Sequence, residues 1–477
     1  MNSVRNKKSL FWFRRDLRLN DNRGLRMALD SGLPVLPIFI FDQEILNKLE
    51  DRDDARVTFI RQALVEMDRE LRENGSSLHV YIGKPEKVFA QILKEHDLAT
   101  IFTNKDYEPY AIERDAQILE LAAKHGVEFS LSKDQVIFEE NEVTKDDGKP
   151  YTMFTPYSRK WLAALQTSDL KSTESEKHLA GLYKSKDGKI PSLKDLGFEE
   201  TSTPLPPVRP EINDKLIAKY LTTRNYPADE SSTSRLGMHL RFGTVSVRDL
   251  MKHAKKATEK TWLKELIWRE FFMQILWHFP HVVKGAFRPE YDKIPFRNDD
   301  ADWKAWTEGK TGFAIVDAGM RELNATGFMH NRVRMIAASV LVKHLLIHWK
   351  EGEAYFARKL LDYELSSNNG NWQWVAGSGC DASPYFRVFN PDLQQKKFDP
   401  KFEYIKKWVP EYGTSKQLEP IIDPITARTR VLRAYKNALN RQTPEPNKAK
   451  AEKAKTAKAS ASSAKKVAPI RKSTRSN

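Results

Sequence analysis

The 477-residue chain has almost no cysteine and no long apolar run. Its single cysteine, Cys380, cannot form an intrachain disulfide and argues against a cysteine-based zinc site, so we expect no bound metal. A lone thiol is typical of a reducing compartment, and we expect a cytoplasmic location if the source is bacterial. No apolar run approaches the roughly 18 residues that a membrane helix needs. The basic N-terminus is followed only by a short apolar stretch, so no secretory signal is expected either.

The first third of the chain also lacks a glycine-rich G-x-G-x-x-G motif, although it has the strand and helix pattern that often accompanies one. Short apolar runs alternate with helix-period segments such as 55–71 and 112–125. This alternation predicts an α/β domain over residues 7–138, built on a five-stranded, parallel, doubly wound sheet. The runs expected to form strands are 10–13, 35–41, 78–82, 100–103 and 127–131. Without the glycine-rich loop, the sheet does not predict an ordinary dinucleotide site.

Basic residues exceed acidic ones, and the excess is concentrated at one end. Lys and Arg number 79 against 64 Asp and Glu, a net charge of +15. Residues 441–477 hold eleven Lys or Arg and two acids, a net of +9, in an Ala-, Lys- and Ser-rich segment without aromatic residues. Such a composition predicts a disordered tail. The tail is either a solubilising segment or an arm that binds nucleic-acid phosphates, and the positive excess favours an anionic partner.

The remaining chain divides into a connection and a helical domain. Residues 139–209 are rich in Pro, Lys, Ser and Asp, as in an inter-domain linker. Residues 210–436 are predicted to form an all-helical domain, because apolar positions recur there with helical period. Its clearest helices are expected at 262–278, 313–324, 331–349 and 353–362. Nine of the eleven tryptophans lie between Trp262 and Trp408, so the aromatic chemistry belongs to this half.

An acid, a large aromatic and a guanidinium recur along one predicted helix. Glu265, Trp268, Arg269 and Phe272 lie on neighbouring turns and are expected to share one side. This arrangement suits a polar cavity with aromatic walls. A salt-bridged core helix has the same pattern, so the helix alone leaves both interpretations open.

Three further clusters support a ligand. Asn331, Arg334 and Met335 share one helical face, and segment 362–374 packs polar residues beside tryptophans. Buried polar groups need partners, which a large heteroaromatic ligand would supply. The hydroxyls of residues 232–234, before an apolar run, predict a helix start that could hold a diphosphate, although any capped helix looks similar.

Together these segments resemble the photolyase/cryptochrome family. The motifs that carry the resemblance occur in family order over residues 7–410: FWFRRDLR at 11–18, TSRL at 233–236, ELIWRE at 265–270, MHNRVRM at 329–335 and NNGNWQW at 368–374. The resemblance implies an α/β domain followed by an all-helical domain that binds FAD.

The resemblance also assigns residues to the flavin. It implies that Asp362 pairs with Arg334 and that Asn368 lies near the reactive ring nitrogen. Two departures stand out: Glu364 replaces the usual Asp, and Phe328 replaces a frequent Trp. The full implied FAD set is Tyr220, Thr233, Ser234, Arg235, Leu236, Gly237, Trp262, Arg269, Arg334, Asp362, Tyr363, Glu364 and Asn368.

The activity implied is blue-light repair of UV-damaged DNA by a monomeric enzyme with no membrane partner. Excited reduced FAD would donate an electron to a cyclobutane pyrimidine dimer flipped out of the helix. The catalytic residues implied are Glu265, Asn331, Met335 and Asn368. The DNA contacts implied are Arg224, Glu265, Trp268, Asn331, Arg332, Met335, Trp374, Arg387 and Gln394.

Two positions separate the family's branches. Relatives that repair (6-4) photoproducts have His where this chain has Asn331 and Met335, and the single-strand-preferring DASH branch has Gln at the second position. Asn and Met are the pattern of cyclobutane-dimer photolyases. A cryptochrome-type photoreceptor without repair activity is the alternative, although such proteins often lack the lesion-pocket tryptophan present here as Trp268.

The resemblance also implies an electron relay and leaves a second chromophore open. Trp372, Trp349 and Trp306 match a relay ordered from flavin to surface, with core packing as the alternative for each. Folate-binding relatives carry Asn and Glu where this chain has Tyr110 and Ala111, which argues against folate. A deazaflavin, another flavin or no antenna all remain open.

Overall fold

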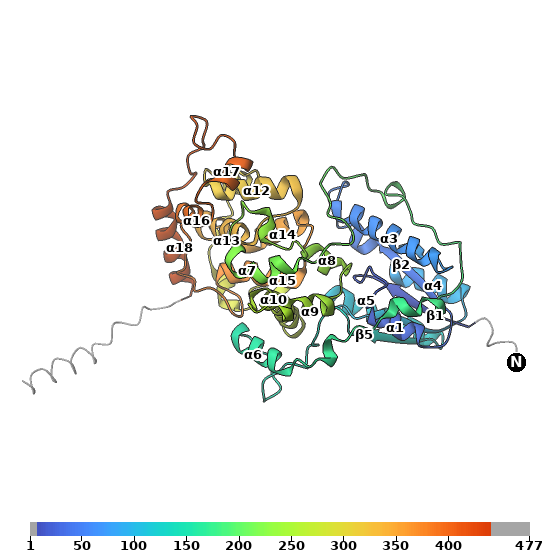
Figure 1. The fold of residues 1–477 in the computed structure, drawn as a ribbon. Coiled ribbons are helices and arrows are strands. Elements are labelled where there is room, and N and C mark those ends of the chain that lie inside the picture. The colour runs from blue at the N-terminus through green and yellow to red at the C-terminus, as the bar shows by residue number, and fades with distance from the viewer. Residues whose placement is uncertain (1–6, 440–477) are drawn as a thin grey trace, which may run out of the picture.

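The computed structural model describes residues 7–439, and the basic tail at 441–477 lies outside the described residues. An α/β domain and a helical domain lie side by side (Figure 1). The first domain is built on the predicted five-stranded parallel sheet, in the order β3-β2-β1-β4-β5. Its strands are β1 (Lys8–Phe13), β2 (Val35–Asp42), β3 (His79–Gly83), β4 (Leu98–Asn104) and β5 (Glu128–Ser132).

Helices cover both faces of this sheet, so its central strands are apolar on both sides. In β1, Phe11 and Phe13 enter one core while Leu10 and Trp12 enter the other. This is the two-residue period of a strand buried on both faces. The domain's helices are α1 (Arg23–Leu29), α2 (Gln43–Leu46), α3 (Ala55–Glu73), α4 (Pro85–Glu95) and α5 (Pro109–Lys124). Helices α1 and α3 pack on the first face, and α4 and α5 on the second.

The connection at 139–209 packs on both domains. Its one α-helix, α6 (Phe154–Ala164), buries Trp161 beside α10 (Thr261–His278) of the helical domain. Further along, Leu179 and Leu182 join the core of the α/β domain. Short 3₁₀ segments complete it: η2 (Ser168–Leu170), η3 (Ser175–Gly181) and η4 (Lys194–Leu196).

The second domain is helical throughout its described length, as expected. Its α-helices are α7 (Asp214–Thr223), α8 (Gly237–Phe242), α9 (Val247–Lys256), α10 (Thr261–His278), α11 (Asp300–Thr307), α12 (Ala314–Thr326), α13 (Asn331–Ser339), α14 (Trp349–Lys359), α15 (Leu365–Ala376), α16 (Pro391–Phe398), α17 (Glu403–Trp408) and α18 (Pro424–Ala438). Short 3₁₀ segments are η5 (Glu230–Ser232), η6 (Pro280–Val283) and η7 (Pro289–Lys293). Between residues 7 and 439, none of the helices is long and apolar enough to cross a membrane.

One predicted helix is in fact broken. The expected helix 331–349 is α13, then a π-helical segment η8 (Val340–Leu345), then a turn in which Leu346 has a φ of +57°. Helix α14 begins at Trp349, so the segment expected at 353–362 starts four residues early and ends at Lys359. Apolar periodicity missed the break because residues 340–347 are all buried.

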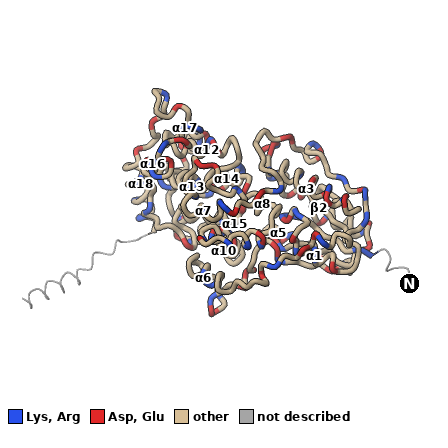
Figure 2. The backbone as a smooth tube through the Cα atoms, in the orientation of Figure 1, with Lys and Arg blue, Asp and Glu red and all other residues tan. Residues whose placement is uncertain are grey.

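Charged residues of both signs occur along both domains (Figure 2). Buried ion pairs among them fix the two domains to each other. Asp134, just after β5, accepts from Arg18 at 2.7 Å and from Arg248 of α9 at 2.8 Å. Burial alone would raise the pKa of Asp134, but the two guanidinium groups lower it to about 2. Gly243 follows α8 with a φ of +65°, and an added Cβ would overlap the backbone of Arg15. This close approach holds the end of α8 against the α/β domain.

Candidate active site: a cavity in the helical domain

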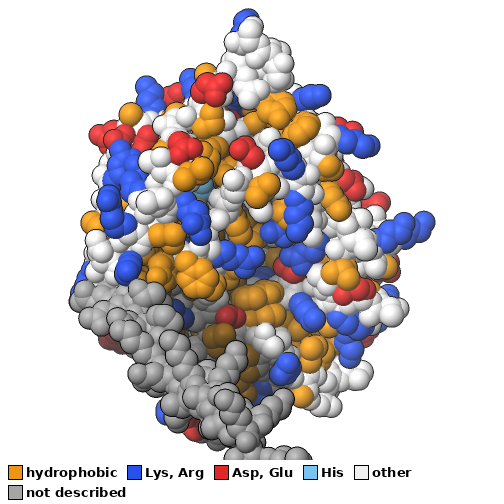
Figure 3. All heavy atoms as spheres, turned by 90° about the vertical axis from the view of Figure 1, so that its left-hand side faces the viewer, with side chains coloured by type: hydrophobic (Ala, Val, Ile, Leu, Met, Phe, Trp, Pro, Cys, Tyr) orange, Lys and Arg blue, Asp and Glu red, His pale blue; other side chains and the backbone are white. Residues whose placement is uncertain are grey.

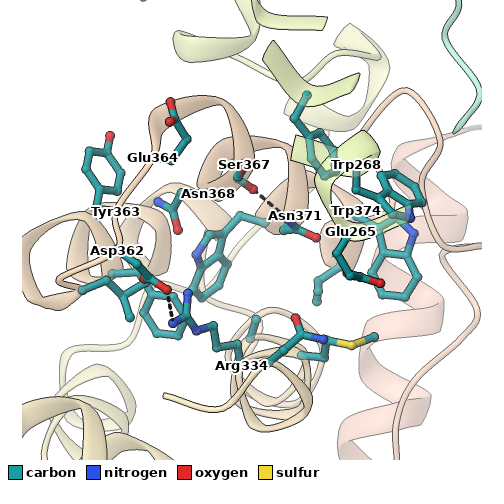
Figure 4. A pocket seen from close by; sticks show the side chains of 18 of the residues that line it. Glu265, Trp268, Arg334, Asp362, Tyr363, Glu364, Ser367, Asn368, Asn371 and Trp374 are labelled. Atoms are coloured by element: carbon teal, nitrogen blue, oxygen red, sulfur yellow. Dashed lines mark hydrogen bonds and ion pairs between the residues drawn. The ribbon is translucent and has the colours of Figure 1, made fainter. Parts of the chain in front are cut away.

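A cavity of about 320 Å³ opens in the helical domain. Figure 4 shows the side chains around it. It brings together many of the residues selected from the sequence: Arg224, Glu265, Trp268, Asn331, Arg334, Met335, Asp362, Tyr363, Glu364, Asn368, Trp372 and Trp374. They come chiefly from α10, α13 and α15, so three separate sequence motifs converge on one site. Its size is within the range of small-molecule sites.

One end of the cavity has aromatic walls. Trp268, Trp374 and Glu265 lie together there (Figure 4). The Trp268 ring stacks on Phe154 at 3.6 Å between centroids, with 6° between the planes. The same ring also lies 5.4 Å from that of Phe272 and meets the Phe271 ring edge-on at 5.6 Å. This packing holds the indole rigidly, which suits a wall against which a flat ligand stacks.

Glu265 is a partly exposed carboxyl that is paired with Arg224. Burial raises the pKa of Glu265, and the Arg224 guanidinium opposes that shift only in part. Asn331 and Met335 also line the cavity, as the shared helical face predicted. The aromatic end therefore offers an acid whose protonated form persists above its usual range, an amide and a thioether.

The opposite end is polar and contains an unsatisfied acceptor. Arg334 donates to Asp362 Oδ2 at 2.9 Å and to the Met329 carbonyl at 2.7 Å, so the expected Arg334–Asp362 pair is present. Asp362 Oδ1 is buried without a hydrogen-bond partner. An added Cβ at Gly237 would meet Asp362 Oδ2 at 2.8 Å, so only glycine lets α8 approach this carboxylate. A ligand with a ring N–H would satisfy the open oxygen, and this end therefore fits a flavin.

Asn368 lies on the same side of the cavity as Asp362 and Tyr363 (Figure 4). Its amide nitrogen donates to the Glu353 carbonyl at 3.0 Å and to Glu353 Oε1 at 2.9 Å. Burial raises the pKa of Glu353, and the bond from Asn368 opposes that shift. Because both amide hydrogens are used, the Asn368 carbonyl oxygen is the polar atom left for a ligand.

Arg269 lies off the cavity face on which it was expected, whereas Glu364 lines the cavity and has further partners. Arg269 does not share the cavity face with Trp268: it donates to the Gln135 carbonyl at 2.7 Å and contributes nothing to the lining. Glu364 lines the cavity but also pairs with Arg15 across the domain junction and lies 3.6 Å from Arg241. Burial favours a raised pKa for Glu364, yet Arg15, Arg241 and Arg269 together hold that pKa below its usual value.

The predicted hydroxyl-capped helix start is wrong. Helix α8 begins at Gly237, its N-cap is Leu236, and no side chain caps it. Thr233 and Ser234 precede this start and therefore do not cap it. The Arg235 guanidinium lies 4.5 Å from the Phe328 ring. Three other residues of the implied flavin set do not line this cavity: Tyr220, Leu236 and Trp262 belong to or pack against the buried cluster around α10.

Two of the three relay tryptophans, Trp372 and Trp306, are in contact, and Trp306 is not at the surface where it was expected. Trp372 lines the cavity, and its ring centroid lies 6.2 Å from that of Trp306. Trp306 was expected at the surface, yet it is 0% exposed because α11 packs it against Phe356. Trp349 is also buried, at 2% exposure, and stacks on His348.

Basic side chains lie near the aromatic end. Arg332 donates to Asn225 Oδ1 at 2.7 Å and lies over the Phe398 ring. Burial lowers the pKa of Arg332, and the positive charges of Arg224 and Arg387 lower it further. Arg387 is exposed and Gln394 is partly exposed. Lys and Arg side chains are spread among hydrophobic ones on the end of the helical domain that faces away from the α/β domain (Figure 3).

Sequence reasoning missed several lining residues. Ser367, Asn371 and Val375 line the cavity with Asn368 and Trp372. These positions recur at intervals of three or four along α15, so extending the helical period from Asn368 would have found them. Leu360, which follows α14, also lines the cavity, and no local pattern marked it.

Comparisons with known proteins agree with this geometry. The FAD binding domain of DNA photolyase matches residues 262–463, and the DNA photolyase domain matches residues 9–176. The deoxyribodipyrimidine photo-lyase of Synechococcus sp. is 36% identical over 84% of this chain and 87% of its own. That of Halobacterium salinarum is 36% identical over 84% and 89%.

Solved structures give the same result. A class III photolyase from Agrobacterium tumefaciens has a TM-score of 0.80 and 30% identity, covering 92% of this chain and 99% of its own. An archaeal photolyase from Sulfolobus tokodaii, described with two FAD molecules, has a TM-score of 0.77 and 34% identity over 90% and 100%. A cryptochrome from Synechocystis shares the fold at 23% identity, with a TM-score of 0.78.

The parallel α/β domain, the helical domain and its two-ended cavity define a flavoprotein of the photolyase type. The chain belongs to the DNA photolyase family, and it is a photo-lyase that uses FAD and acts in DNA repair.

Proposed function

We propose that this photo-lyase splits cyclobutane pyrimidine dimers, with the flavin and the flipped dimer held in one cavity. The observation that carries the proposal is the cavity's division into two ends. Asp362, Arg334 and Asn368 supply the polar contacts that a flavin ring needs, and Trp268 and Trp374 supply flat walls for a dimer. A bound, reduced FAD supplies the light-driven electron.

The protein's own contribution is position and electrostatics. Trp268 stacks against the dimer and replaces the base stacking lost on flipping. Asn331 donates a hydrogen bond to the dimer's carbonyl edge. Glu265, in its protonated form, stabilises the negative charge that develops on the dimer when the electron arrives. Met335 packs against the apolar part of the dimer, and its thioether has no proton to donate.

The DNA backbone is proposed to bind to the basic residues near the aromatic end. Arg224 pairs with Glu265 of the aromatic end, Arg332 lies over the Phe398 ring, and Arg387 is exposed. Such groups bind phosphates without reading sequence. Gln394 would add a polar contact to the DNA. We also propose that the enzyme acts as a monomer.

A second chromophore in the α/β domain is also a proposal, and folate is disfavoured. The Tyr110 hydroxyl donates to Asp42 at 2.6 Å. Glu108 accepts a hydrogen bond from Arg15 at 3.0 Å and forms an ion pair with Arg241. These side chains already have partners. The absorbance spectrum of the chromophores released on denaturation would distinguish a second flavin, a deazaflavin and the absence of an antenna.

The test of the main proposal is dimer splitting. Protein with chemically reduced FAD should split a thymine cyclobutane dimer in DNA under blue light, leave it intact in the dark, and leave (6-4) products unrepaired. Splitting that is absent although the flavin is shown to be reduced would contradict the proposal and favour a photoreceptor. Repair of the (6-4) product would contradict the assignment of the lesion.

A further inference from the structure

We propose that Trp303 of α11 is the outer end of the path that carries electrons to the cavity, and that Trp306 is an inner member of this path. The proposal rests on the proposed flavin photochemistry. Trp303 stacks on Trp306 with 5.6 Å between centroids and 22° between the planes. Trp306 in turn meets Trp372, on the cavity wall, at 6.2 Å. Three indoles thus lie in contact from the cavity wall to the partly exposed Trp303.

Burial explains why the path cannot end at Trp306. Loss of one electron leaves a positive charge on the indole, and Trp306 is 0% exposed in an apolar cluster. Its Nε1–H donates to the Ala337 carbonyl at 3.1 Å, and a carbonyl is too weak a base to accept the proton. A buried charge without a counter-ion is costly. Water can solvate the charge on the partly exposed Trp303, so the charge is more stable there.

The electron balance is complete with one external reductant. Photoreduction of a bound oxidised flavin removes one electron from Trp372. Trp306 refills Trp372, and Trp303 refills Trp306. The oxidised Trp303 indole releases its Nε1 proton to water and becomes a neutral radical. An external thiol then returns one electron and one proton to Trp303.

Tyr355 is the competing outer end. Its ring lies 5.7 Å from Trp306 and 5.8 Å from Trp303, and its hydroxyl donates to Asn324 Oδ1 at 2.6 Å. Burial raises the pKa of Tyr355, and a neutral phenol must lose its proton to be oxidised readily. Trp303, which is stacked on Trp306 and open to water, is therefore the better donor.

The experiment compares Trp303→Phe and Tyr355→Phe with the unmodified FAD-loaded protein. Trp408→Phe is the control, because it removes a partly exposed indole elsewhere in the molecule. Photoreduction in the presence of a thiol is followed by absorbance. In parallel, the protein is illuminated without thiol but with a nitroso spin trap, digested with trypsin and analysed by mass. Trypsin separates the three aromatic residues, since Trp303 lies in peptide 298–304, Trp306 in 305–310 and Tyr355 in 351–358.

The expected result is a severalfold slower photoreduction in Trp303→Phe alone, with the trap attached to peptide 298–304 of the unmodified protein. Normal photoreduction in Trp303→Phe, or a trap attached mainly to 305–310 or 351–358, overturns the proposal. Dimer splitting by chemically reduced protein is a separate measurement. A chain that traps at Trp303 but splits no dimers retains this electron path and loses the proposed lesion chemistry.

Discussion

At the scale of single residues, the cavity depends on a few side chains held in fixed positions. Trp268 packs on Phe154 and Phe272, and Asn368 is held by two bonds to Glu353. Asp362 keeps one oxygen paired with Arg334 and the other unsatisfied. Groups fixed in this way lose little entropy when a ligand binds.

Replacing Trp268 by alanine should weaken binding of dimer-containing DNA by about 1–3 kcal/mol, because base–aromatic stacking contributes about that amount. Binding of undamaged DNA, which does not enter the cavity, should change little. Titrations of matched oligonucleotides with and without the dimer give both values, and Trp408→Ala serves as the control. Equal weakening for the two oligonucleotides would mean that Trp268 acts only in folding.

Glu265 should make repair depend on pH. Because its pKa is raised, the protonated form persists into a higher range and declines as pH rises through that pKa. The repair yield of the unmodified enzyme should fall over the same range, whereas Glu265→Gln, which cannot ionise, should show a flatter profile. The yield is measured with chemically reduced flavin across pH. Parallel profiles for the two proteins would exclude a proton on Glu265 from the chemistry.

At the scale of elements, close helix contacts place Trp372 in the cavity wall. Gly352 of α14 lies against the six-membered ring of Trp372 on α15, and an added Cβ would overlap that ring. The two helices can therefore approach only because residue 352 has no side chain.

Gly352→Ala should destabilise the fold by about 1–3 kcal/mol, the usual cost of overpacking a core. The double variant Gly352→Ala with Trp372→Phe should recover part of that loss, because the smaller ring vacates the overlapping space. Denaturant unfolding of the two single variants and the double variant measures this coupling. Additive losses would show that the glycine does not act through Trp372.

The elements also show how much the sequence could predict. Alternating strands and helices predicted all five strands of the sheet, because a sheet buried on both faces has continuous apolar runs. The break at 340–348 was not predictable, since every residue of η8 is buried and the pattern continues through it. The position of Arg269 was not predictable from helical period. The period shows which residues share a side of a helix, but the bond from Arg269 to Gln135 depends on a segment 134 positions away.

At the scale of the whole molecule, three buried histidines link stability to pH. Burial lowers the pKa of His239, His330 and His344 to about 4, mainly through desolvation. Each has a folded-state pKa below the unfolded value. Their contribution to stability is therefore complete above about pH 6.5 and is lost as pH falls through about 4.

The free energy of unfolding should therefore fall on acidification from pH 6.5 to 4, by up to about 3 kcal/mol for each histidine. His239→Asn keeps an acceptor for its bond with Thr244 but cannot be protonated, so this variant should lose less stability over that interval. Denaturant unfolding at several pH values measures the difference, with the exposed His125→Asn as the control. Identical pH slopes in all three proteins would contradict this origin of acid sensitivity.

The central claim is that flavin and flipped dimer occupy one cavity, close enough for direct electron transfer. The most direct measurement is the excited-state lifetime of the reduced, protein-bound flavin with and without DNA. We expect dimer-containing DNA to shorten this lifetime and undamaged DNA of the same sequence to leave it unchanged. Trp268→Ala should remove the difference at equal DNA concentration. A lifetime that bound dimer DNA leaves unchanged would contradict the central claim.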